Sequence, residues 1–390
     1  MEDVVILGST GSIGTQAADI VSRHADRFRV TGLAASGTQI DVLADQVGAL
    51  CPGTVALADP AAAALRQALA VRDVRTPAIT TGPDAVAHLA GSGATVVLNA
   101  ITGYAGLEPT LAALAAGSRL ALANKESLVV GGDLVTGAAK SGQITPVDSE
   151  HSAIAQALAS GRADEVRRLI LTASGGPFRG RTRADLAGVT PAQALAHPTW
   201  QMGRVVTINS ATLVNKGLEL IEAVRLFGVG WDDVEVVVHP QSQVHSMVEF
   251  RDGSTIAQCS PPDMRLPIAL GLSWPDRLGD VTAGFDWRAA QDWTFEPLDE
   301  ATFPAVGLAR RVGRLGGTVP AVFNAANEVC VDAFCEARLG FLGIVDVVTG
   351  VVDAYCATGR PQPDTLSLGT IRTADAWARA TARTVIERTA

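Results

Sequence analysis

The chain has 390 residues, of which 47% are hydrophobic and 18% are charged, and its formal net charge is −9. This length predicts two or three domains, and the hydrophobic content is ample for their cores. The excess of acidic residues argues against nucleic acid or an anionic membrane surface as a partner.

Three features of the sequence predict a cytoplasmic protein. No basic segment or cleavage site precedes the first apolar run, so we expect no secretory signal. Gly, Ser, Thr and Asn interrupt the longest uncharged run, residues 85–107, so we expect no membrane span. The five cysteines are never spaced as C-x-x-C, so we expect them to be reduced, small buried side chains.

The first motif is a glycine-rich turn. Residues 4–7 predict a strand, G-S-T-G-S-I-G follows at residues 8–14, and a helical pattern covers residues 17–23. This context is typical of a dinucleotide-binding fingerprint, although the spacing G-x-x-G-x-x-G departs from the usual one and a plain glycine turn stays possible. The groups that would face a pyrophosphate belong to Thr10, Gly11, Ser12 and Ile13.

The end of the second predicted strand, residues 30–34, bears on which nucleotide binds. NAD-binding sites usually place Asp or Glu there to hold the ribose 2′-hydroxyl. This chain has Ser36-Gly37-Thr38 instead. Small hydroxylated residues leave room for a 2′-phosphate, so Ser36 and Thr38 favour NADP.

Further strand and helix patterns alternate along residues 55–139. Such alternation predicts an α/β, Rossmann-type domain over residues 1–149, with a parallel, doubly wound sheet. Ligands bind at the carboxyl ends of strands in these sheets. Asn99 and the run Asn124-Lys125-Glu126-Ser127 follow predicted strands, so we expect them to belong to a site.

Two carboxylates follow the predicted strand at residues 144–147. In extended backbone Asp148 and Glu150 would face the same side. They could bind Mg²⁺ or Mn²⁺, or they could form an acid/base pair. A helix cap by Asp148 or Ser149 explains the pattern equally well, and we expect His151 to be structural.

The central region, residues 150–275, predicts an α+β catalytic domain. A strand at residues 169–172 ends in Ser174-Gly175-Gly176, which is either a phosphate-binding turn or an ordinary one. Residues 197–204, H-P-T-W-Q-M-G-R, predict a lid that excludes water, or else a small satellite core. Three strands, two of them joined by an Asp-Gly hairpin, are expected over residues 234–258. His239 and His245 are expected to be structural.

Residues 209–222 predict a single helix with Ser210 and Thr212 at capping positions. The helical period places Asn215, Lys216 and Glu219 on one face. That arrangement suits an anion site with a carboxylate one turn further along. The alternative is a surface helix with an ordinary Lys–Glu pair, and Glu222 is expected to be an ordinary helix residue.

The C-terminal part predicts a linker, residues 276–299, and then an all-α domain, residues 300–390. Helical patterns cover residues 303–315, 321–335, 343–357 and 372–388, which is typical of a helical bundle. We expect the motif F-N-A-A-N-E at residues 323–328 to be mainly structural.

Taken together, seven motifs resemble the 1-deoxy-D-xylulose 5-phosphate reductoisomerase family: G-S-T-G-S-I-G, A-N-K-E-S, P-V-D-S-E-H, S-G-G-P-F, H-P-x-W-x-M-G, N-S-A-T-x-x-N-K-G-L-E and F-N-A-A-N-E. The resemblance covers nearly the whole chain. It implies NADPH- and metal-dependent conversion of the keto-sugar phosphate into 2-C-methyl-D-erythritol 4-phosphate, in non-mevalonate isoprenoid biosynthesis. It also implies Mg²⁺, Mn²⁺ or Co²⁺ as the metal, and a homodimer.

The resemblance assigns roles to residues at matching positions. It implies metal ligands at Asp148, Glu150 and Glu219, and catalytic roles for these three with Lys125 and His197. The substrate residues it implies are Lys125, Ser149, Glu150, Ser174, His197, Trp200, Ser210, Asn215, Lys216 and Glu219. For the nucleotide it implies Thr10–Ile13, Asn124, Glu126 and Gly203, with the lid over residues 197–204. The family often has Gly-Lys-Asn where this chain has Ser36-Gly37-Thr38, so here the 2′-phosphate would lack that lysine.

Two other classes of protein remain possible on the residues alone. Another Rossmann dehydrogenase, acting on an aspartate-derived aldehyde or a keto acid, needs no three carboxylates and would keep its activity in EDTA. A regulator that senses NADP would bind NADPH tightly without oxidising it.

Overall fold

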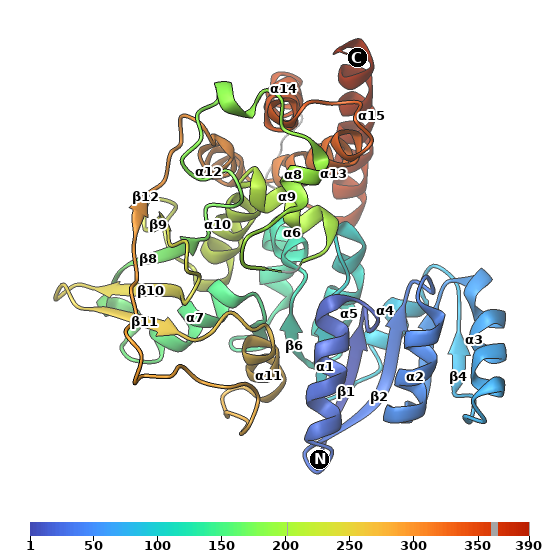
Figure 1. The fold of residues 1–390 in the computed structure, drawn as a ribbon. Helices are drawn as coiled ribbons and strands as arrows, with labels where there is room; N and C mark the ends of the chain where they lie inside the picture. Colours follow the sequence, from blue (N-terminus) through green and yellow to red (C-terminus); the bar gives the residue numbers. More distant parts are fainter. Residues whose placement is uncertain (201, 360–365, 390) are drawn as a thin grey trace. The chain divides into compact units, whose positions relative to one another are not determined.

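The computed structural model describes residues 1–200, 202–359 and 366–389, and it divides into two compact units (Figure 1). Unit 1 comprises Met1–Ser127, Gly137–Ser152 and Asp263–Ala283, and unit 2 comprises Leu128–Thr136, Ala153–Pro262 and Gly284–Ala390. The domain boundaries predicted at residues 149, 275 and 299 stay a prediction. Over the described ranges, no helix combines the length and the apolar character needed to cross a membrane.

Unit 1 contains a seven-stranded parallel sheet, which confirms the predicted Rossmann-type fold. The spatial order is β4-β3-β2-β1-β5-β6-β7. The strands are β1 (Glu2–Leu7), β2 (Phe28–Ala35), β3 (Thr54–Leu57), β4 (Ala78–Thr80), β5 (Val96–Asn99), β6 (Arg119–Leu122) and β7 (Ile144–Pro146). The order reverses between β1 and β5, where Leu7 pairs with Asn99. Ligands of doubly wound sheets bind at such a switch point, so the glycine-rich turn after β1 lies at the expected place.

Eight helices contribute to unit 1 or run across its boundaries: α1 (Ser12–Arg23), α2 (Ile40–Leu50), α3 (Asp59–Val71), α4 (Ala85–Ala90), α5 (Leu107–Ala115), α6 (Lys125–Ala138), α7 (Ser149–Leu158) and α11 (Arg265–Ser273), besides the 3₁₀ turn η1 (Tyr104–Gly106). The chain bends inside α6 at Gly132, whose φ is 43°. The sequence patterns missed β4, α4 and α11. Strand β4 has only three residues and little burial, so it lacks the apolar alternation of a half-buried strand.

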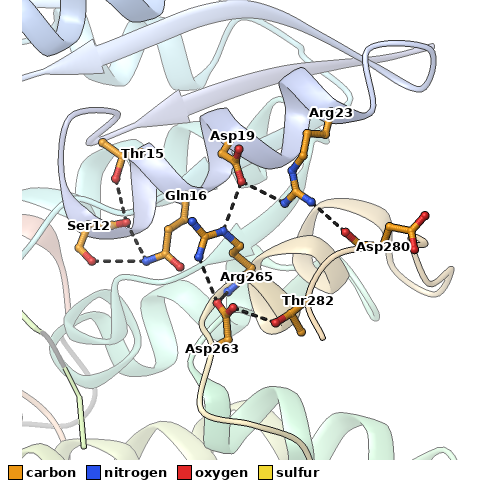
Figure 2. Close-up of polar contacts among 9 residues, drawn as sticks. All are labelled: Ser12, Thr15, Gln16, Asp19, Arg23, Asp263, Arg265, Asp280 and Thr282. Atoms are coloured by element: carbon orange, nitrogen blue, oxygen red, sulfur yellow. Dashed lines mark hydrogen bonds and ion pairs between the residues drawn. The ribbon is translucent and has the colours of Figure 1, made fainter. Parts of the chain in front are cut away.

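Helix α11 packs against α1 in unit 1, and Figure 2 shows the polar contacts that hold it. The Nε of Arg265 donates to Asp19 at 3.3 Å, and Asp19 also accepts from Arg23 at 3.0 Å. Arg265 also faces Asp263, which in turn accepts the Thr282 hydroxyl at 3.0 Å. These contacts tie residues 263–283 to α1, although their sequence neighbours belong to unit 2.

Gly14 lets α1 approach the turn that precedes it, and we predict that Gly14→Ala separates them. A Cβ at position 14 would lie 2.2 Å from the Gly8 carbonyl oxygen and 2.5 Å from Ser9 Cα, both backbone atoms. We expect Gly14→Ala to lower the free energy of unfolding by about 1–3 kcal/mol and to weaken NADPH binding. Calorimetric melting with and without NADPH measures both effects.

Gly137→Ala is the matched control for this prediction. Gly137 also lies in a helix of this part of the chain, but nothing lies within 4 Å of its would-be Cβ. The higher helix propensity of alanine then predicts a gain of up to about 1 kcal/mol. Equal melting temperatures for the Gly14 variant and the parent protein would contradict the steric argument.

Unit 2 contains a mixed five-stranded sheet with the order β11-β10-β8-β9-β12. The strands are β8 (Val166–Ala173), β9 (Val234–Val238), β10 (Val244–Phe250), β11 (Thr255–Cys259) and β12 (Glu296–Pro297). β10 and β11 form the predicted antiparallel hairpin around Asp252-Gly253. Only the β8–β9 pair is parallel. This sheet confirms the predicted α+β character of the central region.

The helices of unit 2 include the predicted C-terminal bundle. They are α8 (Pro191–Leu195), α9 (Arg204–Ala211), α10 (Val214–Phe227), α12 (Ala305–Leu315), α13 (Val319–Cys335), α14 (Phe341–Ala357) and α15 (Leu368–Thr389), with 3₁₀ turns η2 (Ala163–Glu165) and η3 (Ala184–Leu186). One hydrophobic cluster runs from β8 through α10 to α15. The four C-terminal helices are therefore confirmed, and they share their core with the central sheet.

The predicted single helix over residues 209–222 is wrong, because the chain forms two helices there. α9 ends at Ala211 and α10 starts at Val214. Between them Leu213 has φ 60°, a left-handed conformation that costs a non-glycine residue about 1 kcal/mol or more. Its side chain is 4% exposed within the core of unit 2, and this burial offsets the strain.

The cysteines also differ from expectation. All five are free thiols, as predicted, but only Cys330 is buried, and Cys51 is exposed. Burial raises the pKa of the Cys330 thiol to about 12, so this side chain is an unreactive core residue.

Candidate functional site

The turn between β1 and α1 has the geometry of a nucleotide-binding turn. The Gly11 N–H donates to the Gly8 carbonyl at 3.0 Å, and Gly8 has φ +76°. Gly11 is the N-cap of α1, and no side chain caps this end. The helix therefore presents the N–H groups of Ser12 and Ile13 at its positive end, where an anion is favoured. Thr10 lies in the same turn, 8% exposed.

The loop after β2 lies next to this turn. The Ser36 and Thr38 hydroxyls are 3.1 Å apart and exposed, and the Gln39 amide donates to the Thr10 carbonyl at 3.2 Å. A Cβ at Gly37 would lie 2.2 Å from Ala61 Cβ, and the φ of Gly37 is +87°. This backbone has no space for a side chain at position 37. The polar side-chain groups that the loop presents are therefore the Ser36 and Thr38 hydroxyls.

Asn99 ends β5 and Asn124 follows β6, as predicted, and both side chains make hydrogen bonds within unit 1. Asn99 is 0% exposed and donates to the Gly106 carbonyl at 2.9 Å. The Asn124 amide donates to the Ile101 carbonyl at 2.6 Å and to Glu126 at 2.9 Å. Asn99 and Asn124 therefore fix the backbone around the carboxyl ends of β5 and β6, and their place in a site stays a prediction.

Unit 1 holds a buried acid–ammonium pair. Lys125 starts α6, Asp148 precedes α7, and the Lys125 ammonium lies 2.5 Å from the Asp148 carboxylate. Their side chains are 10% and 11% exposed. The His151 ring, fully buried, lies 3.6 Å from the other Asp148 oxygen. Burial by itself would raise the pKa of Asp148, but the charge of Lys125, followed by His151, lowers it well below its usual range.

The expectation that Asp148 and Glu150 lie in extended backbone is wrong. Helix α7 begins at Ser149, so Glu150 lies in its first turn. The Asp148 carbonyl accepts the Ser152 N–H at 2.9 Å, and the Ser149 hydroxyl donates to Glu150 at 2.6 Å. Asp148 and Glu150 therefore stand at the helix start, which also favours carboxylates through its positive dipole.

Unit 2 holds the second acid–ammonium pair, on α10. Lys216 contacts one oxygen of Glu219, and the Asn215 amide donates to the other at 2.5 Å. Lys216 is 4% and Glu219 1% exposed. Because both side chains are buried, the pair is not the ordinary exposed Lys–Glu pair of the surface-helix alternative. Burying two charges also costs free energy that an exposed pair does not have to offset. Glu222, expected to be an ordinary helix residue, is also buried.

The Ser-Gly-Gly turn after β8 packs on the end of α9. Gly176 has φ +66°, and a Cβ there would lie 2.9 Å from the Ser210 carbonyl. Ser174 Oγ lies 3.1 Å from His197 Nε2. Ser210 lies in the last turn of α9 rather than at the predicted helix start, and Gly203 is the N-cap of α9. Burial lowers the pKa of His197.

The predicted lid, residues 197–204, is partly outside the described residues, because Gln201 is not described. Trp200 is half-buried, with its ring centroid 6.1 Å from that of His245. Arg204 already belongs to α9.

Sequence reasoning missed one buried polar pair in unit 2. The Asn327 amide donates to Asn209 Oδ1 at 2.9 Å, and these side chains are 1% and 4% exposed. Asn209 directly precedes Ser210, so the F-N-A-A-N-E motif reaches the segment that carries a predicted phosphate ligand. The only signal in the sequence is two asparagines in an apolar helix.

His239 and His245 are structural, as predicted. The Gln243 and Val244 N–H groups both donate to His239 Nε2 at 3.1 Å, and His245 Nε2 lies 3.2 Å from the Ser260 carbonyl. Burial lowers the pKa of His245 to about 4, so the ring is neutral at pH 7.

We predict that His245 makes unit 2 sensitive to acid. Its folded pKa of about 4 lies below the ordinary histidine value of 6.5, so the unfolded chain takes up the proton first. The stability it contributes is complete above pH 6.5 and is lost as the pH falls toward 4, by about 2 kcal/mol between pH 7 and pH 5. In urea titrations, the difference in free energy of unfolding between the parent protein and His245→Gln should be smaller at pH 5 than at pH 7 by that amount. The exposed His88→Gln is the control, and an unchanged difference would contradict the prediction.

A doubly wound sheet with a glycine-rich turn, in a chain with a second α+β unit and buried carboxylate–ammonium pairs, is typical of nucleotide-dependent oxidoreductases. The family model described as 1-deoxy-D-xylulose 5-phosphate reductoisomerase matches residues 4–132, and two models of its C-terminal domain match residues 144–227 and 259–381. The chain belongs to the 1-deoxy-D-xylulose 5-phosphate reductoisomerase family.

Known relatives resemble the chain over its whole length. The reductoisomerase of Cutibacterium acnes is 60% identical over 403 residues, covering 100% of this chain and 99% of its own. The structure of the Zymomonas mobilis enzyme in complex with NADPH is 42% identical, with a TM-score of 0.90 and 99% coverage of each chain. A reductoisomerase in complex with NADPH, fosmidomycin and magnesium is 35% identical, with a TM-score of 0.93 and coverage of 99% and 98%.

Proposed function

We propose that this chain converts 1-deoxy-D-xylulose 5-phosphate into 2-C-methyl-D-erythritol 4-phosphate with NADPH as the reductant and Mg²⁺ or Mn²⁺ as the metal. The reaction belongs to non-mevalonate isoprenoid biosynthesis. The observation that carries the residue assignment is that each unit buries a carboxylate against one of the chain's three lysines, Lys125 with Asp148 and Lys216 with Glu219. Such pairs are costly to bury, which favours a role in the site over one in stability.

NADPH is assigned to the edge of the sheet at the carboxyl ends of β1 and β5, where the strand order reverses. Its pyrophosphate is assigned to the uncapped start of α1. Its 2′-phosphate is assigned to the Ser36 and Thr38 hydroxyls. The exposure of these hydroxyls and the absence of an acidic residue beside them support the assignment. The remaining nucleotide residues are Thr10, Gly11, Ser12, Ile13, Asn124, Glu126 and Gly203.

The metal is assigned to Asp148, Glu150 and Glu219. The donor set fits a hard divalent cation, because it consists of carboxylate oxygens. When bound, the cation supplies Lewis-acid polarisation of the substrate oxygens, and NADPH supplies the hydride that completes the reaction. Lys125 keeps Asp148 ionised, the Ser149 hydroxyl orients Glu150, and Asn215 with Lys216 orients both oxygens of Glu219.

The substrate phosphate is assigned to the Ser-Gly-Gly turn and the α9–α10 junction. The residues are Ser174, His197, Ser210, Asn215 and Lys216, with Trp200 covering the substrate. Lys125, Ser149 and Glu150 are assigned to its hydroxyl and carbonyl groups. A covering side chain suits a reaction that passes through a reactive aldehyde, because it keeps water away.

One assay tests this function directly. The NADPH absorbance is followed with 1-deoxy-D-xylulose 5-phosphate, with Mg²⁺ or Mn²⁺ and with EDTA. We expect oxidation only when substrate and divalent metal are both present. Full activity in EDTA would instead indicate an ordinary dehydrogenase, and tight NADPH binding without oxidation would indicate a regulator.

We further propose that the enzyme is a homodimer and works in the cytoplasm. Family resemblance supports the first, and the five free thiols support the second. Analytical ultracentrifugation across a concentration series tests the dimer, and cell fractionation tests the compartment.

A further inference from the structure

Both ring nitrogens of His197 have partners within unit 2. Nδ1 accepts the backbone N–H groups of Thr199 at 3.1 Å and Trp200 at 2.9 Å, while Nε2 lies 3.1 Å from Ser174 Oγ. A backbone N–H can only donate, so Nδ1 carries no hydrogen. The ring is therefore neutral, with its hydrogen on Nε2, and it donates to the Ser174 oxygen.

This tautomer fixes the direction of the Ser174 hydroxyl. Ser174 Oγ accepts from His197 Nε2–H and also from the Gly176 N–H at 3.2 Å. A hydroxyl oxygen has two acceptor positions, and both are then filled. The Ser174 hydrogen must point elsewhere, so this hydroxyl is prepared to donate to an incoming acceptor.

We propose that His197 is a positioning residue. Its ring forms a relay, because Nδ1 accepts the Thr199 and Trp200 N–H groups while Nε2–H donates to Ser174. The Ser174 hydroxyl, rather than the imidazole, then donates to the substrate phosphate. This inference rests on the proposed function for the identity of the phosphate. It replaces the direct phosphate contact of His197 with a contact made through Ser174.

The electrostatics of the ring agree with this arrangement. Burial lowers the pKa of His197, which favours the neutral ring at pH 7. A second hydrogen on the ring would sit on Nδ1, facing the two N–H groups of Thr199 and Trp200. Protonation of the ring would therefore break the turn that follows His197. The neutral ring keeps both the turn and the hydrogen bond to Ser174.

Two amide substitutions separate the two ends of the relay. In His197→Asn the side-chain oxygen takes the place of Nδ1, as in an Asx-turn, but nothing reaches Ser174. In His197→Gln the amide nitrogen reaches the position of Nε2, but the acceptor at Nδ1 is lost. Ser174→Ala removes the final donor and leaves the turn intact, so it is the matched control.

Two readouts follow the two ends without requiring turnover. Hydrogen exchange of the Thr199 and Trp200 amides reports the turn, and the dissociation constant of inorganic phosphate reports Ser174. We expect His197→Asn to keep slow exchange and to bind phosphate about tenfold more weakly, like Ser174→Ala, since a hydrogen bond to a charged group contributes this much. We expect His197→Gln to exchange at least about tenfold faster and to bind phosphate within about threefold of the parent.

The outcome that overturns the relay is equally specific. If both His197 variants lose phosphate affinity equally while Ser174→Ala keeps it, the imidazole itself contacts the phosphate. ¹⁵N-histidine NMR of the unaltered protein, with His197→Asn used only for assignment, gives a test that needs no stable variant. A hydrogen on Nδ1 at pH 7 would rule out the relay, whereas lack of turnover in the NADPH assay would count against the proposed function alone.

Discussion

We expect Glu219→Gln to lower kcat/KM by at least about a thousandfold, or about 4 kcal/mol of transition-state stabilisation. Glu219 is 1% exposed and its two oxygens accept from Lys216 and Asn215. Glutamine keeps the size but removes the charge, so the proposed metal site loses an anionic ligand. The Lys216 ammonium also loses its carboxylate partner inside the core, which is costly. NADPH binding is assigned elsewhere and should not change.

Three measurements check this prediction together: kcat/KM over a range of Mg²⁺ concentrations, Mn²⁺ binding by calorimetry, and NADPH binding by fluorescence. Glu235→Gln is the matched control, because Glu235 lies on β9 of the same unit and is exposed. It should keep full activity. A Glu219 variant with parental kcat/KM and Mn²⁺ affinity would remove Glu219 from the metal site.

Local patterns were enough to predict the C-terminal bundle and every strand of the unit 1 sheet except β4. The predicted strands are short, largely buried apolar runs, and the bundle helices have an apolar period. The polar groups at the carboxyl ends of strands were also predicted. Lys125 was expected in a site from its position after a strand, whereas Asp148 was left open between a site and a helix cap, and the structure pairs the two at 2.5 Å.

What could not be predicted depends on contacts between distant parts of the chain. No glycine or proline marks the break before α10, because burial of the Leu213 side chain pays for its left-handed backbone. Likewise, Asn209 and Asn327 are 118 positions apart, so no local period reveals their hydrogen bond. The helical start at Ser149 was hidden for a related reason, since D-S-E fits both a strand end and a helix cap.

We expect Lys125→Met to lower the free energy of unfolding by about 3–5 kcal/mol and to abolish turnover. Breaking a buried ion pair by removing one partner leaves the other charge uncompensated, and Asp148 is 11% exposed. Without the Lys125 charge the pKa of Asp148 rises, because burial then acts with less opposition. Methionine has a similar length, so packing is largely kept. Lys140→Met is the matched control, since Lys140 is exposed.

The pH dependence of this loss identifies Asp148 as its source. In the parent protein the lowered pKa of Asp148 contributes stability that is present above its unfolded pKa, about 3.9, and is lost as the pH falls through the folded value. The deficit of Lys125→Met in metal-free urea titrations should therefore be largest near pH 7 and should narrow as the pH approaches 4. Adding Asp148→Asn to Lys125→Met should recover stability at pH 7, because no unpaired buried charge remains, while activity stays absent. If the double variant were less stable than Lys125→Met, the lysine would contribute by packing rather than by holding the Asp148 charge.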